Sequence, residues 1–88
     1  MIMITGINEV FEHDGRELHI QCEDFGSEKA SYEVRVYDQG TVLWLKSIAY
    51  ADIVEKGLGR SEHEHELRLH MNKTVATVKA AIAKGKIV

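Results

Sequence analysis

Five histidines provide this 88-residue chain with its first candidates for chemistry. His63, Glu66 and His70 have the spacing of one helix face, and two imidazoles with a carboxylate form a donor set for a divalent metal. A ligand set on one exposed helix has no surrounding groups to orient its imidazoles. We therefore expect a solvated polar helix face here, with no metal and no cofactor. A small-ligand or metal-binding protein that uses surface histidines is kept as an alternative function.

A second candidate is the run that contains His19, Gln21 and Glu23, which alternate along a predicted strand. A histidine near a carboxylate can act as a general acid–base pair. Side chains at i and i+2 of a strand are ~6.6 Å apart at the backbone. The sequence places no obvious nucleophile or oxyanion hole beside them. An enzyme that uses His19 and Glu23 is therefore the weaker alternative, and we assign no catalytic residue.

The elements that position these residues begin with a hairpin. Asp14-Gly15 separates two runs of alternating hydrophobicity, and Asp-Gly is a strong signal for a two-residue hairpin turn. The resulting register is Phe11 opposite Leu18, Glu9 opposite Ile20 and Ile7 opposite Cys22, on one largely apolar face. Cys22 is then a buried, inert thiol.

Gln39-Gly40 is a plausible second tight turn. The predicted strands cover residues 7–13, 16–24, 31–38 and 41–47. With a two-residue turn, the outward face pairs Tyr37 with Val42, Arg35 with Trp44 and Glu33 with Lys46. Arg35 over the Trp44 indole could form a cation–π pair. A bulge at Gly40 would instead slip this register by one residue and dissolve these pairs.

Two helices are predicted after the sheet. Ala49 to Lys56 forms a short helix, which Gly57 ends in a left-handed cap. Ser61 with Glu64 three residues later is a capping box, and it opens a helix that runs to about residue 83 or 84 before Gly85. Its apolar stripe consists of Leu67, Met71, Val75, Val78 and Ile82. The chain is thus one α+β domain, residues 1–88: a four-stranded antiparallel sheet of two hairpins, a short helix, and a long C-terminal amphipathic helix packed on one face.

The long helix and the strands differ in length. A helix of ~23 residues is about 35 Å long, whereas a strand of ~7 residues spans about 23 Å. We therefore expect the helix to overhang its own sheet, so that Val78 and Ile82 need cover from a second chain. This mismatch predicts a homodimer or a complex with another protein.

The outward sheet face carries large aromatic side chains and an arginine on an otherwise polar surface, which suits an interaction surface. Cover by the short helix or by the loop at Phe25 is an equally weighted alternative. The predicted interaction surface comprises Val10, His19, Arg35, Tyr37, Val42, Trp44, Val78 and Ile82. The favoured function is a non-enzymatic protein-interaction or dimerisation module.

The composition limits the classes of partner that we expect. The formal net charge is −3, which argues against nucleic acid as the main partner because phosphate binding favours a basic domain. The single cysteine, Cys22, fits a reducing compartment, and the short apolar start lacks the features of a signal peptide. No apolar run approaches the ~20 residues that span a bilayer. We expect a cytoplasmic protein without membrane contact.

Two segments carry a resemblance to a known family. His19-Ile20-Gln21-Cys22-Glu23-Asp24-Phe25-Gly26 and Lys46-Ser47-Ile48-Ala49-Tyr50-Ala51-Asp52-Ile53 resemble a small bacterial domain of unknown function. Its members have a His-x-Gln-Thr-Glu-Asp-x-Gly segment and a hairpin that leads into a helix start containing tyrosine. Cys22 replaces the more usual threonine. The resemblance covers about residues 14–54, supports the fold boundaries and implies no catalytic residues.

Overall fold

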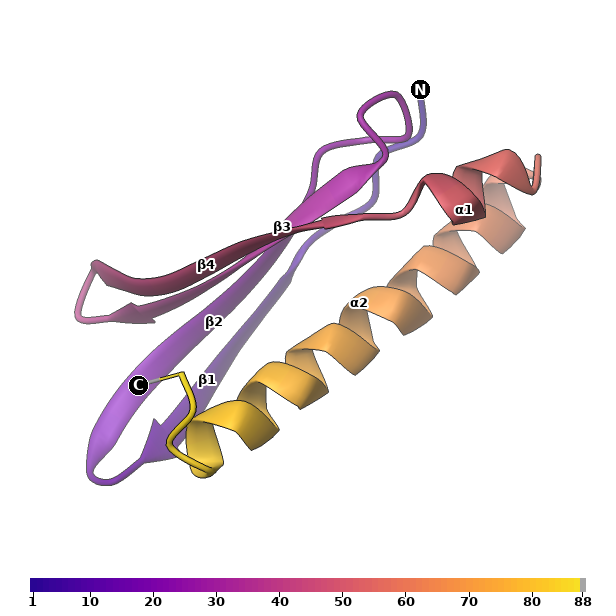
Figure 1. Ribbon diagram of the computed structural model, residues 1–88. Helices are drawn as coiled ribbons and strands as arrows, with labels where there is room; N and C mark the ends of the chain where they lie inside the picture. The colour runs from indigo at the N-terminus through magenta and orange to yellow at the C-terminus, as the bar shows by residue number, and fades with distance from the viewer. Residues whose placement is uncertain (88) are drawn as a thin grey trace.

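The computed structural model describes residues 1–87 and confirms the α+β fold (Figure 1). One antiparallel sheet has the order β1-β2-β3-β4. Its strands are β1 (Ile7–His13), β2 (Arg16–Asp24), β3 (Ser31–Asp38) and β4 (Thr41–Ala49). The short helix α1 (Ala51–Glu55) follows, and the long helix α2 (Arg60–Ala83) lies along one face of the sheet. Among these 87 residues, no helix is long and apolar enough to cross a membrane.

The first hairpin forms as predicted. Asp14 and Gly15 both have positive φ, 51° and 76°, which is the conformation of a two-residue type I′ turn. The register is the expected one, with Phe11 opposite Leu18, Glu9 opposite Ile20 and Ile7 opposite Cys22. The β2 residues of this face, including Cys22, are buried beneath α2.

The second hairpin has the predicted turn but a different register. Gln39 and Gly40 have φ of 50° and 82°, so the two-residue turn forms. Tyr37 pairs with Val42 as expected, but the next pair is Val36 with Trp44, and Leu43 bulges between them. The bulge that the sequence analysis considered at Gly40 thus lies three residues later, within β4.

This bulge turns Trp44 to the opposite side of the sheet. Because side chains alternate along a strand, a slip of one residue exchanges the two faces. Trp44 now shares the helix-facing side with Val36, and Arg35 pairs with Leu45 instead. The predicted Arg35–Trp44 and Glu33–Lys46 pairs are therefore wrong, since Lys46 lies opposite Val34.

The long helix does not leave its apolar stripe uncovered. Val78 and Ile82 are 4% and 0% exposed within the single chain, so the expectation that they need a second chain is wrong. The reason is that α2 runs diagonally, with its last turns over β1 and β2 and its first turns against α1 (Figure 1). Lys79 also forms an ion pair of 2.9 Å with Glu9 of β1.

Glycine residues, and not side-chain caps, mark the ends of the helices. Gly57 and Gly85 have φ of 63° and 72° and end α1 and α2 as predicted. The N–H groups of Gly85 and Lys86 donate to the carbonyls of Ile82 and Ala81, which is a Schellman motif. The predicted capping box is wrong, because α2 begins at Arg60 after Gly59 and has no side-chain cap.

Candidate functional site: the groove between β4 and α2

A buried carboxylate joins three parts of the fold. Asp24, at the end of β2, is 3% exposed. Its Oδ2 accepts a hydrogen bond from the Ile4 N–H (3.0 Å), and its Oδ1 accepts from the Gly26 N–H (3.0 Å) and the Tyr50 hydroxyl (2.5 Å). Burial, together with the Asp24 carboxylate, raises the pKa of Tyr50 above its usual value. With three donors around it, this carboxylate holds the fold together and is not open to a substrate.

Two stacked tyrosines connect this carboxylate to α2. The rings of Tyr50 and Tyr32 are stacked with centroids 6.2 Å apart. The Tyr32 hydroxyl lies 2.7 Å from Nδ1 of His70 and 2.6 Å from Oγ1 of Thr74. Burial raises the pKa of Tyr32. The His70 ring is therefore fixed against β3, with one nitrogen already used.

The residues weighed as metal ligands have separate partners, and the expectation that they form a solvated helix face is wrong for His63, which is 3% exposed. Glu66 forms an ion pair with Lys56 (2.6 Å), and His70 is bonded to Tyr32. His63 is buried against the Tyr50 ring, at a centroid distance of 6.0 Å, and its Nε2 has no hydrogen-bond partner. In the part of the chain that the structure describes, no three His, Cys, Asp or Glu side chains are grouped as a metal site.

The outer face of the sheet carries most of the predicted interaction surface. Val10 lies opposite His19, His19 opposite Tyr37, and Tyr37 opposite Val42, so these side chains form one row across the sheet. A shallow hollow of about 340 Å³ lies beside His19 and Tyr37. No helix lies over this face among residues 1–87 (Figure 1). Trp44, Val78 and Ile82, by contrast, belong to the helix-facing side.

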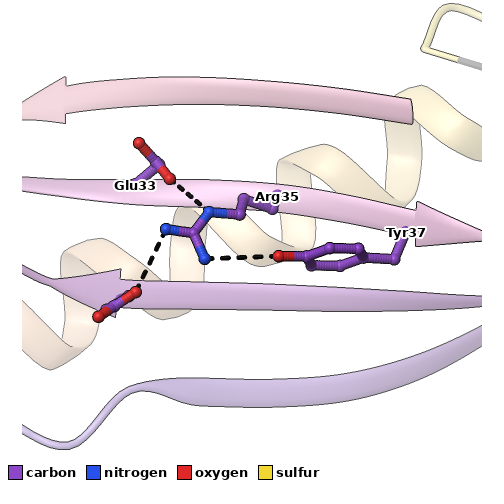
Figure 2. Close-up of polar contacts among 4 residues, drawn as sticks. Glu33, Arg35 and Tyr37 are labelled. Carbon is purple, nitrogen blue, oxygen red and sulfur yellow. Dashed lines mark hydrogen bonds and ion pairs between the residues drawn. The ribbon is translucent and has the colours of Figure 1, made fainter. Parts of the chain in front are cut away.

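Arg35 is hydrogen-bonded to three of its neighbours on the outer face (Figure 2). Its Nε donates to Glu33, its Nη2 lies 3.3 Å from Glu23 Oε2, and its Nη1 lies 3.4 Å from the Tyr37 hydroxyl. The hydrogen bond to Tyr37 and the Glu33 carboxylate raise the pKa of Arg35. The guanidinium thus stabilises the sheet surface, and these contacts use three of its five N–H groups.

The acid–base pair considered as the weaker alternative, His19 with Glu23, is not assembled. His19 Nε2 contacts Glu17 (3.3 Å), whereas Glu23 contacts Arg35. On a strand, residues four apart are separated by about 13 Å. The structure therefore places His19 and Glu23 with different partners and does not bring them onto one reacting centre.

A large concavity lies on the other side of the sheet. Because α2 packs on β1 and β2, it leaves the helix-facing side of β4 open, and a groove of about 540 Å³ separates β4 from α2. Its apolar lining consists of Trp44, Ile48, Val78, Ala81 and Ile87. Its polar lining consists of Lys46, His70, Lys73, Thr74 and Thr77. Trp44 is partly exposed in this groove.

Lys46 and Lys73 line the groove but are not among the site residues predicted from the sequence. Lys46 reaches the groove only because the bulge at Leu43 moves it to the helix-facing side, and Leu43 is an ordinary strand residue that gives no local signal of a bulge. Lys73 lies on α2 two residues after Met71 of the predicted stripe, at the margin of the covered face. The groove as a whole depends on the angle between α2 and β4. The local sequence pattern does not predict that angle.

No family model, curated protein or solved structure matches this chain. The resemblance of residues 14–54 to the bacterial domain therefore stays a prediction. The structure does bring its two segments together, since Asp24 and Tyr50 are hydrogen-bonded.

Proposed function

We propose that this protein is a non-enzymatic binding module and that the groove between β4 and α2 is its binding surface. The observation that supports it best is the partly exposed Trp44 within an apolar groove of about 540 Å³. Ligand sites typically have volumes of about 300–1,000 Å³ and are mostly apolar. Tryptophan is also enriched among the residues that dominate binding energy.

The polar clusters support binding over catalysis. Asp24 is enclosed by three donors, Arg35 is bonded to its own sheet, and His19 and Glu23 have separate partners. A general acid or base must lie within hydrogen-bond reach of its substrate. The groove instead offers apolar area with charged groups at its margin.

Self-association through the outer face of the sheet is the second candidate. It is favoured by exposed apolar side chains on that face, among them Val10, Val42 and Leu45, which are 55%, 47% and 51% exposed.

Edge-to-edge pairing through β4 is disfavoured. A bulge and an inward-facing lysine, here Lys46, are features that protect edge strands from pairing. Light scattering at micromolar concentration would detect a dimer.

The test of the groove uses a neutral apolar probe, 1-octanol, titrated into ¹⁵N-labelled protein. We expect amide and indole shifts centred on Trp44, Ile48 and Ala81. Trp44→Ala should abolish these shifts, whereas Leu45→Ala, a neighbour on the opposite face, should keep them. Shifts centred on Val10 and Tyr37, or no localised shift, would contradict the groove as the binding surface.

A further inference from the structure

The ionisable groups that line the groove are all basic. The chain has 14 acidic and 11 basic residues, yet the lining contains Lys46, Lys73 and His70 and, among the residues the structure describes, no carboxylate. Lys46 comes from β4 and Lys73 from α2, so each wall of the groove contributes one ammonium group. The groove is therefore a local positive region on an acidic domain.

The side-chain ammonium group of neither lysine is paired with a carboxylate in the described part of the fold. No ion pair among residues 1–87 includes Lys46 or Lys73, whereas Lys56 and Lys79 are paired with Glu66 and Glu9. The other polar groups of the lining are already bonded. His70 and Thr74 share the Tyr32 hydroxyl, and the Thr77 hydroxyl donates to the Lys73 carbonyl. The two ammonium groups are thus the charged lysine groups of the lining that form no ion pair among residues 1–87.

The size of the groove favours a slender occupant. Its α2 wall extends from His70 to Ala81, about 16 Å at 1.5 Å per residue. An extended eight-carbon chain is shorter than this wall, and the groove volume of about 540 Å³ lies within the range of small-ligand sites. An alkyl chain fits this volume, and its methylenes would lie along Trp44, Ile48 and Val78.

We infer that the groove binds a medium-chain carboxylate, with its alkyl chain along Trp44 and its carboxylate between Lys46 and Lys73. This inference rests on the proposed function, because it names the ligand class of the same groove. Apolar area supplies most of the affinity, and each added methylene tightens binding about fourfold. The ammonium groups select the anionic head.

The test compares octanoate with two probes of the same chain length, neutral 1-octanol and cationic octylammonium, by NMR titration of the full chain. We expect octanoate to bind about tenfold more tightly than octanol, since its carboxylate can form a surface ion pair with each of the two ammonium groups. Octylammonium should bind more weakly than octanol. Decanoate should bind more tightly than octanoate by roughly 15-fold, for two methylenes.

Charge-removing variants locate the head group. Lys46→Met with Lys73→Met should reduce octanoate affinity to that of octanol, whereas Lys84→Met, which changes an exposed lysine outside the groove, should leave it unchanged. Because the Lys46 and Lys73 side chains are both exposed, the NMR spectrum of the double variant should match that of the wild type outside the groove.

The failures of the two proposals are distinguishable. If octanol shifts the groove residues and octanoate binds no more tightly, the carboxylate inference is overturned and the binding groove stands. If neither probe shifts Trp44, both are overturned. A concentration-dependent dimer that broadens the groove resonances would assign the groove to a second copy and would also overturn the inference.

Discussion

Tyr50 donates a 2.5 Å hydrogen bond to Oδ1 of Asp24, which joins the residue after β4 to the last residue of β2. Both partners are buried. The same carboxylate also holds the N-terminal segment through Ile4 and the loop through Gly26. This pair therefore fixes the end of the sheet from which α1 and α2 begin.

Removing the Tyr50 hydroxyl should destabilise the protein. Tyr50→Phe keeps the ring stacked on Tyr32 but leaves Asp24 with one donor fewer, and hydrogen bonds to charged groups contribute about 1.5–3 kcal/mol. The free energy of unfolding, measured in urea, should fall by that amount. Tyr37→Phe on the outer face is the control and should change it by less than about 0.5 kcal/mol. Equal effects for the two variants would contradict the role of the pair.

The protein should lose stability at alkaline pH. Burial raises the pKa of Cys22 from 9.0 to about 12, and burial also raises the pKa of Tyr32 and Tyr50. Groups whose pKa is higher in the folded state keep their protons there while the unfolded chain loses them, so the folded state is penalised as pH rises. The contribution of these groups to stability should be constant below about pH 9, and stability should fall between pH 9 and 12.

Two measurements check this pH dependence. The urea midpoint should decrease from pH 9 upward, and Cys22→Ala should reduce the slope between pH 9 and 12. At pH 8 a thiol reagent should label Cys22 only at the rate of unfolding, because the thiol is buried. Rapid labelling of the folded protein would contradict the buried position.

Replacing His63 by leucine should stabilise the protein. His63 is 3% exposed, and its Nε2 has no hydrogen-bond partner. An unsatisfied buried polar atom costs about 1–3 kcal/mol, and leucine fills a similar volume without that cost. We expect the free energy of unfolding, measured in urea, to rise by about 1 kcal/mol. His65→Leu, at an exposed position, should change stability by less than about 0.5 kcal/mol. A loss of stability in His63→Leu would show that the imidazole has a partner in solution.

The basic groove should be detectable without any ligand. Trp44 is the only tryptophan, so its fluorescence reports this groove alone. Iodide should quench it more efficiently than caesium, because Lys46 and Lys73 concentrate anions there. The difference should shrink in 1 M KCl, where screening acts over about 3 Å. Lys46→Met with Lys73→Met should remove it, and an iodide preference that survives this change would contradict the local charge.

The elements that the sequence predicts correctly are those with local causes. Asp14-Gly15 and Gln39-Gly40 supply the turns, and the apolar stripe from Leu67 to Ile82 supplies the buried side of α2. His63 precedes Leu67 by four residues, so the same stripe held a signal for its burial that the sequence analysis did not use.

The candidate site was less predictable because its causes are not local. Asp24 ends a polar run and is buried only because Ile4, Gly26 and Tyr50 supply donors from three separate segments. A regular ladder that continues past Val42 predicts Trp44 on the outer face, whereas the bulge places it on the helix-facing side. The groove depends on both the bulge and the helix angle, and neither is encoded in a short window of sequence.

The bulge at Leu43 also has an evolutionary consequence. In a regular hairpin, the side on which a residue lies depends on whether its distance from the turn is odd or even, so an insertion near the tip would move every later side chain across the sheet. Here the bulge absorbs one residue between Val42 and Trp44. A lineage could lose Leu43 and still keep Trp44 opposite Val36. Loss of that one bulged residue would thus leave the aromatic wall of the groove in place.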